Sequence, residues 1–195
     1  SRSLYVLPLV NIPHTTTNAI NARQRNIVNL RGFKLCIGVR NNLASPVCFH
    51  AALLHNKESD ATAPTTIDFF RGYGTNRADD FSTALTGIQM NARPINSAKY
   101  TILHHSRHTL LPDEHTTEGG YNQAGAPTNW KNLEWYQSVN RQIQFESVTD
   151  NNPFSGNIYW VYWVESQFAN ANDPTSGDAC TMQQEIITFW KEPRT

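Results

Sequence analysis

Histidine is concentrated between residues 104 and 115, where metal binding or proton transfer would be the natural chemistry. His104, His105 and His108 stand beside Arg107, and His115 follows. In an extended strand His104 and His108 share one face about 13 Å apart, while His105 points to the other. One metal ion does not bridge that distance, so a zinc site would need a bulge or another segment. We therefore expect a polar strand face that titrates near neutral pH, with no bound metal.

Sequence signatures of catalysis are absent. The chain contains no G-x-S-x-G, H-E-x-x-H, Walker or G-x-G-x-x-G motif. The carboxylate pairs Asp79-Asp80 and Asp113-Glu114 lack the supporting ligands of a calcium site or an acid-base pair. Residues 71–75 (RGYGT) resemble a phosphate loop but lack the following lysine and helix. We expect neither an enzyme nor a cofactor.

Basic residues provide candidates for contact with nucleic acid. Lysine and arginine together number 16, as do aspartate and glutamate, so the net charge is zero. A neutral chain exerts no global attraction on nucleic acid or anionic lipid. The alternative interpretation is therefore scattered surface charge, balanced by nearby acids. The candidates lie on the first predicted strand and its approach, in the next loop and on the third strand: Arg23, Arg25, Arg31, Lys34, Arg71, Arg77, Lys99 and Arg107.

Composition bounds the class of protein. The chain has 195 residues, enough for one domain, here taken as residues 1–195. Charged residues make up 16% and hydrophobic residues 39%, which excludes a coiled coil and bulk disorder. Cys36, Cys48 and Cys180 are too few and too far apart for a disulfide framework, so we expect buried thiols in a reducing compartment. Apolar runs are too short to span a membrane, and no membrane partner is expected.

Alternation of apolar and polar residues predicts six strands. Residues 22–30 lead into residues 32–40 as one long strand. Residues 157–165 are aromatic on both faces, so we expect a central strand that is covered on both sides. The other predicted strands span 47–55, 99–111, 135–146 and 181–191. The clearest alternation, within 32–40, places four apolar residues on one face: Phe33, Leu35, Ile37 and Val39.

Long connections separate these strands. Residues 56–98 and 113–132 are interrupted by glycine and proline and predict long loops, with one helical turn near 81–85. Residues 1–20 are interpreted as a lead segment. One or two further strands within the loop stretches would complete an all-β sandwich of about eight antiparallel strands. The uneven connections favour a jelly roll over a barrel with tight hairpins.

Aromatic residues in these connections have two interpretations. On a rigid sandwich they would anchor contacts between subunits, or they would pack onto their own sandwich. The interface candidates are Phe69, Phe70, Tyr73, Tyr121 and Trp130.

The order of segments resembles a viral coat protein family. Residues 94–110 (PINSAKYTILHHSRHTL) are similar to the P-x-N-x-x-x-Y-x-V-L motif of capsid proteins from circular single-stranded DNA viruses that encode a Rep protein, such as circoviruses. The resemblance covers segment order over residues 20–190. It implies a jelly-roll subunit that assembles with copies of itself into an icosahedral T=1 shell around circular single-stranded DNA. It also implies a virion protein that assembles in the host nucleus and binds a host receptor, which the sequence does not identify.

The sequence departs from this family at its start. Such capsid proteins begin with an arginine-rich arm that binds the genome, and the segment before Arg23 contains only Arg2. A shell of neutral subunits does not offset one phosphate charge per nucleotide. We therefore expect a basic arm to precede Ser1 in the native protein.

Three alternatives remain open. A carbohydrate-binding jelly roll would expose Trp160 or Trp163 for stacking on sugars. A metal-dependent enzyme of cupin type would use the histidines of residues 104–108, although the usual G-x₅-H-x-H spacing is absent. The coat protein of a small RNA virus would share the same fold.

Overall fold

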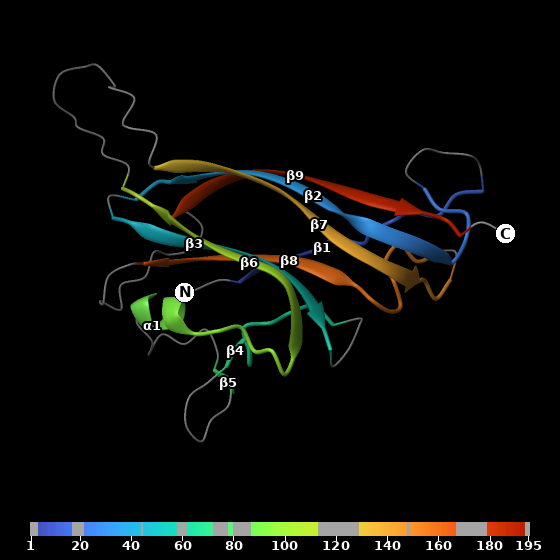
Figure 1. Cartoon of the computed structure of the whole chain (residues 1–195), viewed down its shortest axis with the longest axis horizontal. Coiled ribbons are helices and arrows are strands. Elements are labelled where there is room, and N and C mark those ends of the chain that lie inside the picture. Colours follow the sequence, from blue (N-terminus) through green and yellow to red (C-terminus); the bar gives the residue numbers. More distant parts are fainter. Residues whose placement is uncertain are drawn as a thin grey trace, which may run out of the picture.

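Nearly all of the regular structure is β (Figure 1). The computed structural model describes residues 4–16, 22–43, 45–57, 62–71, 78–79, 87–112, 129–147, 149–166 and 179–193. Its elements are β1 (Tyr5–Pro8), β2 (Ile27–Asn41), β3 (Val47–Asn56), β4 (Phe70–Arg71), β5 (Ala78–Asp79), α1 (Gly87–Ala92), β6 (Tyr100–Leu110), β7 (Trp130–Gln144), β8 (Ile158–Ser166) and β9 (Cys180–Lys191). Within these ranges, α1 is the single helix, and no helix is long and apolar enough to cross a membrane.

Two antiparallel sheets face each other and form a sandwich. The four-stranded sheet has the order β1-β8-β3-β6, and the three-stranded sheet has the order β7-β2-β9. All of these neighbouring strands pair antiparallel. The prediction of an all-β antiparallel sandwich is confirmed.

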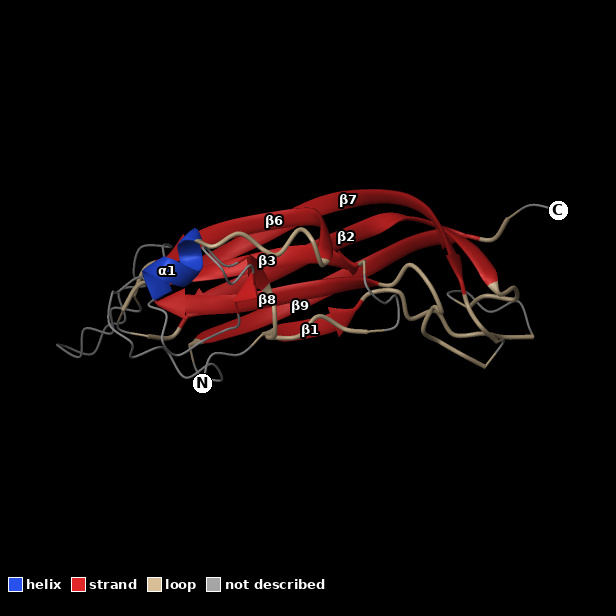
Figure 2. Cartoon of the chain, turned by 90° about the horizontal axis from the view of Figure 1, so that it is seen from below, coloured by secondary structure: helices blue, strands red, loops and turns tan. Residues whose placement is uncertain are grey.

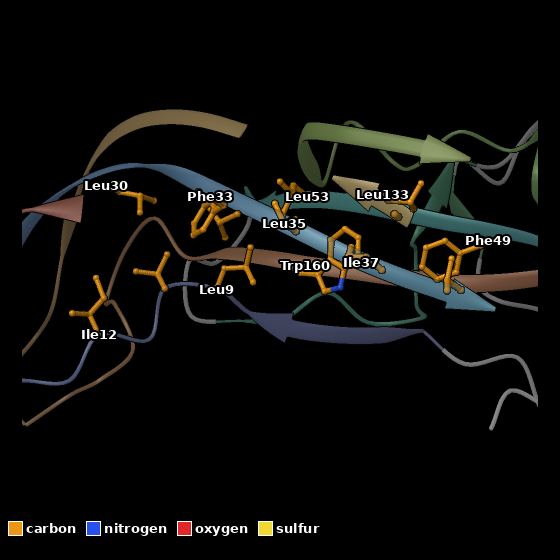
Figure 3. Close-up of a cluster of buried hydrophobic side chains, with 14 of the residues drawn as sticks. Leu9, Ile12, Leu30, Phe33, Leu35, Ile37, Phe49, Leu53, Leu133 and Trp160 are labelled. Carbon is orange, nitrogen blue, oxygen red and sulfur yellow. The ribbon is translucent and has the colours of Figure 1, made fainter. Parts of the chain in front are cut away.

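The core lies between the two sheets and follows the predicted alternation of β2. The four apolar side chains from Phe33 to Val39 are all buried, whereas the polar residues between them are at least partly exposed. Leu53 of β3 and Trp160 of β8 meet them from the other sheet (Figure 3). Burial at every second position is therefore what stabilises this strand in its register.

A third layer covers the outer face of the four-stranded sheet. Helix α1 and the short strands β4 and β5 lie on the side of this sheet that faces away from the three-stranded sheet (Figure 1). Met90 of α1 and Tyr100 of β6 are buried there with Trp163. Strand β8 thus packs on both faces, with Trp160 toward the main core and Trp163 toward the third layer. The prediction that residues 157–165 form a central, covered strand is confirmed.

Several boundaries differ from the predictions. The long first strand begins at residue 27 rather than 22, and β7 begins at residue 130 rather than 135. The lead segment contains β1, which is too short to show an alternation. The predicted turn at 81–85 lies outside the described residues, and α1 follows at 87–92. The three cysteines are free thiols, of which Cys48 is buried and the other two are half-buried.

Candidate nucleic-acid interface

Among the strands of the two main sheets, basic residues are concentrated in the three-stranded sheet. The strands of the four-stranded sheet carry one basic and one acidic residue, Arg107 and Glu165. The three-stranded sheet carries two acidic residues, Glu134 and Glu185. Its six basic residues give it an excess of positive charge: Arg31, Lys34, Arg40, Lys131, Arg141 and Lys191.

Several of these charges reach solvent on the outer face of the three-stranded sheet. Lys34 and Arg40 alternate with core residues of β2 and therefore point away from the core. Lys191 extends the same face at the end of β9, and Arg31 is exposed at an irregularity in the register. Acidic residues on this face are fewer than basic ones, and they are Glu134 and Glu185.

Exposed aromatic rings share this outer face. Trp130 is 46% exposed, Tyr136 is 55% exposed and Phe189 is 41% exposed. In the register, Trp130 is the neighbour of Arg40, and Tyr136 is the neighbour of Lys34. Large aromatic surfaces left in solvent beside cations are the combination that proteins use to bind unpaired nucleic acid strands.

Gly32 allows two of these rings to come together. Tyr136 and Phe189 make an edge-to-face contact with ring centroids 5.8 Å apart. The Tyr136 ring lies over Gly32, where a Cβ atom would stand 2.7 Å from the Tyr136 hydroxyl oxygen and 2.3 Å from the Gln137 carbonyl oxygen. The Tyr136 hydroxyl donates a hydrogen bond of 3.4 Å to the Arg31 carbonyl oxygen. Any side chain at this position would displace the tyrosine.

Two shallow hollows indent the same sheet. One, of about 490 Å³, is lined by Cys36, Gly38, Asn132, Glu134 and Glu185 among others. The other, of about 280 Å³, shares Gly38 and extends to Arg40 and Trp130. Because Gly38 has no side chain, the middle of β2 is low between its flanking strands. The two hollows are lined by amide and carboxylate side chains, and the Trp130 ring lies at one end.

An ion pair holds one cation on this face. Lys34 Nζ lies 2.6 Å from Glu134 Oε1 on the neighbouring strand. The hydrogen bond to Glu134, together with the charge of that carboxylate, raises the pKa of Lys34. Lys34 therefore stays charged across the physiological range, and its exposed ammonium is held beside Tyr136.

The prediction for Arg23 is wrong, because its guanidinium is a structural group. Its side chain is 0% exposed and donates to the carbonyl oxygens of Arg25 at 2.9 Å, Ser147 at 2.9 Å and Asp150 at 2.5 Å. The guanidinium also stacks over the Phe145 ring, 3.9 Å from its centroid. Burial lowers the pKa of Arg23. No surface remains there for a phosphate.

The other predicted basic residues do not form one surface. Arg31 and Lys34 lie on the three-stranded sheet, and the Arg25 guanidinium donates to the Pro193 carbonyl oxygen at 3.0 Å. Arg107 lies on the opposite sheet and donates to the Asn91 carbonyl oxygen at 2.6 Å. Lys99 donates to the Ile67 carbonyl oxygen at 3.2 Å, and Arg71 is exposed on β4. Arg77 lies outside the described residues.

The aromatic residues predicted as interface candidates also do not form one surface. Phe69 and Phe70 are fully buried inside the subunit, where their ring centroids lie 5.3 and 5.8 Å from that of Trp163. Their proposed role as subunit anchors is therefore wrong, since packing on their own sandwich occupies both rings. Trp130 is exposed, as an interface residue would be. Tyr73 and Tyr121 lie outside the described residues.

Carbohydrate stacking on Trp160 or Trp163 is excluded by their position. Trp160 is 0% exposed and Trp163 is 1% exposed. Both rings pack within the subunit, so neither presents a face to a sugar. On the described strands, the exposed rings of Trp130, Tyr136 and Phe189 lie on the outer face of the three-stranded sheet instead.

The histidines of β6 divide between two faces, as predicted. His104 and His108 pair with core residues Leu53 and Phe49, so they point inward, while His105 points outward. Burial lowers the pKa of His105 to about 4, so the expected titration near neutral pH is wrong for this ring. Among the described residues, no cluster of three or more histidine, cysteine, aspartate or glutamate side chains has the geometry to hold a metal ion.

Sequence reasoning missed most of the outer face, although a signal was present. Trp130, Asn132, Glu134 and Tyr136 occupy alternate positions of β7, and Phe189 belongs to the matching set on β9. All of them are polar or aromatic, which is the pattern of a solvent-facing side of an edge strand. Comparison with known proteins adds no further assignment, because no family model and no curated protein matches this sequence.

Proposed function

We propose that this protein is the coat subunit of a small virus, which assembles with copies of itself into a closed icosahedral shell around single-stranded DNA. The outer face of the three-stranded sheet is the surface that meets the nucleic acid. The observation that carries this proposal is the excess of positive charge on that face, where a chain of zero net charge places four basic residues (Arg31, Lys34, Arg40 and Lys191) against two acidic ones (Glu134 and Glu185). Exposed aromatic rings on the same face supply stacking surfaces.

The order of the strands supports a jelly roll. Strands β3 and β6, β2 and β7, and β1 and β8 form nested antiparallel pairs, as if one long ribbon had been folded on itself. Rolling that ribbon brings β8 beside β3 and β9 beside β2, and both of these pairs are present. A jelly roll has this connectivity, and viral shells are among the assemblies built from it.

Single-stranded DNA suits the chemistry of this face. Unpaired bases expose both ring surfaces, which stack on aromatic side chains without regard to sequence. Phosphates are attracted by Lys34, Arg40 and Lys191, with a dependence on salt. A duplex keeps its bases inside its own stack, so only the attraction between its phosphates and the basic residues would contribute to binding. We therefore expect single strands to bind more tightly than duplexes of equal length.

Removing two exposed rings tests the nucleic acid part of the proposal. We expect Trp130→Ala combined with Tyr136→Ala to weaken binding of an oligothymidine by roughly tenfold to a thousandfold, because each lost stack is worth about 1–3 kcal/mol and the two losses need not add fully. Fluorescence anisotropy at fixed salt measures the dissociation constant. Phe154→Ala is the matched control, since that ring is 60% exposed and its residue lies outside the three strands of this face. Equal affinity of the double variant and the parent protein would overturn the assignment of the face.

Assembly is tested separately. We expect light scattering and electron microscopy to show closed particles of uniform size once single-stranded DNA is added to the purified protein. A sample that binds DNA through this face yet remains one molecule at high concentration would overturn the coat role. The protein would then be a nucleic-acid-binding module with the same site.

A further inference from the structure

Two histidines join helix α1 to the outer face of the four-stranded sheet. His50 Nε2 of β3 lies 2.5 Å from Asn91 Oδ1 on α1. His50 Nδ1 lies 3.3 Å from His105 Nε2 on the neighbouring strand β6. His50 is 1% exposed, and its ring stacks on Trp163 with centroids 4.5 Å apart. The contact is therefore a partly buried chain of polar groups, with the buried His50 ring at its centre, from one strand to the next and on to the helix.

The hydrogen bonds of the packed pair have no place for two added protons. The Asn91 oxygen is an acceptor, so His50 Nε2 must carry the hydrogen. His50 Nδ1 is then an acceptor and receives the hydrogen of His105 Nε2. A proton added to His50 Nδ1 would place two N–H groups against each other. One added proton still fits if His105 carries its own hydrogen on Nδ1 and accepts from His50 at Nε2, but protonation of both rings leaves two N–H groups facing each other and is incompatible with the packed arrangement.

The titratable and charged groups around His50 and His105 include one cation, on β6, and one carboxyl group, on β8. On β6, Arg107 follows His105 and donates to the Asn91 carbonyl oxygen at 2.6 Å, so it also holds the helix. On β3, the Cys48 thiol is neutral, because burial raises its pKa to about 11. On β8, the buried Glu165 follows Trp163 at the next position of the same face. Helix α1 contributes no charged residue.

Burial keeps the two rings neutral in the packed state. It lowers the pKa of His50 to about 3; the hydrogen bond to Asn91 acts in the raising direction, and the charges of His105, Arg107 and His108 add to the lowering. It lowers the pKa of His105 to about 4, with further lowering by Arg107 and His104. A histidine released into water takes up its proton near pH 6.5. The packed state therefore resists a proton that the released state accepts.

We propose that α1 is held by an acid-sensitive latch, in which protonation of the His50–His105 pair releases the helix from the four-stranded sheet while the sandwich stays folded. The latch does not depend on the proposed function. In a coat protein it would make the third layer of each subunit responsive to an acidic compartment.

The direction of the pH effect follows from the pKa of each histidine, which is lower in the packed state than in the released state. Each histidine binds its proton more weakly in the packed state, so acid favours release. Below about pH 6.5 each ring shifts the equilibrium toward the released state by up to tenfold per pH unit, until the pH nears its packed-state value. Two rings together give up to about a hundredfold per unit. Above about pH 7 neither ring contributes.

Hydrogen exchange on the full chain measures this release. After correction for the pH dependence of intrinsic exchange, we expect protection of residues 87–92 to fall at least a hundredfold from pH 7 to pH 4.5. Amides of β2 and β8 should stay protected, which separates local release from global unfolding. Unchanged protection of α1 at pH 4.5 would overturn the proposal.

Variants assign the effect to the pair. His50→Gln combined with His105→Gln keeps polar groups without a titrating ring, so we expect the fall in protection to shrink below tenfold. His104→Gln is the matched control, because that ring is on the inner face of the same strand, stacked on Trp135. If the double variant loses protection in acid as the parent does, the latch is wrong.

A measurement on the unmodified protein covers the case in which the double variant does not fold. Long-range ¹H–¹⁵N spectra report the protonation state of each imidazole, and we expect His50 to be neutral with its hydrogen on Nε2 at pH 6. Trp163 emission should change together with α1 protection, since both histidine rings stack on this indole. A charged His50 at pH 6 with α1 still protected would overturn the proposal.

Discussion

Arg23→Met is expected to lower the free energy of unfolding by about 3–5 kcal/mol, because at least two long-range hydrogen bonds from a charged donor, worth about 1.5–3 kcal/mol each, would be lost. The Arg23 guanidinium is enclosed and serves the carbonyl oxygens of Ser147 and Asp150, which come from a turn far away in sequence. Methionine fills much of the volume but donates nothing. The partly buried carbonyls would lose their donor, at up to about 1–3 kcal/mol each.

Urea denaturation followed by circular dichroism measures this loss. Arg25→Met is the matched control, because the Arg25 guanidinium is exposed and its single bond to the Pro193 carbonyl is on the surface. We expect the control to change stability by less than about 0.5 kcal/mol. A loss below about 1 kcal/mol for Arg23→Met would contradict the structural role. Affinity of the folded variant for oligothymidine should remain that of the parent.

Trp160→Ala is the second substitution with a large expected effect, again about 3–5 kcal/mol. The indole is fully buried between the sheets, where its centroid lies 5.6 Å from that of Trp135. Its Nε1 donates to Gln184 Oε1 of β9 at 3.0 Å, so the residue also ties the two sheets together. Alanine would leave a cavity that the paired strands do not close.

The contrast with Trp130 makes this prediction specific. Trp130 is exposed on the edge strand β7, so Trp130→Ala should cost less than about 1 kcal/mol in the same denaturation experiment. Stability would then depend on Trp160, and DNA binding on Trp130. Equal destabilisation by both substitutions would show that the exposed ring belongs to the core.

Much of the fold was predictable because burial repeats at every second residue. The alternation from Phe33 to Val39 was enough to identify β2, and the aromatic residues on both faces of β8 were enough to place it at a sheet centre. Strand β1 could not be found in this way, since four residues are too few for a period. The first residues of β7 were missed because both sides of that edge strand are largely polar or exposed.

Less of the candidate site was predictable, because it depends on which strands are neighbours. Lys34 meets Tyr136 and Ile187 only through pairings with β7 and β9, and no local pattern specifies those pairings. The position of Arg23 shows the same limit. Its sequence neighbours Gln24 and Arg25 are exposed, and burial comes from carbonyl groups supplied by residues 147–150. Phe69 and Phe70 are buried for a similar reason, by a sheet formed from other segments.

The pairing of β2 with β9 has a consequence for biosynthesis. Asn29 lies opposite Lys191, so the cationic sheet joins segments from nearly opposite ends of the chain. Such distant contacts close slowly, since much loop entropy is lost before they form. On the ribosome, β2 must wait for β9 to be translated before its second edge is covered. A nascent chain therefore lacks the finished outer face until translation has passed β9, and under the proposed function capture of nucleic acid would be restricted to subunits beyond that point.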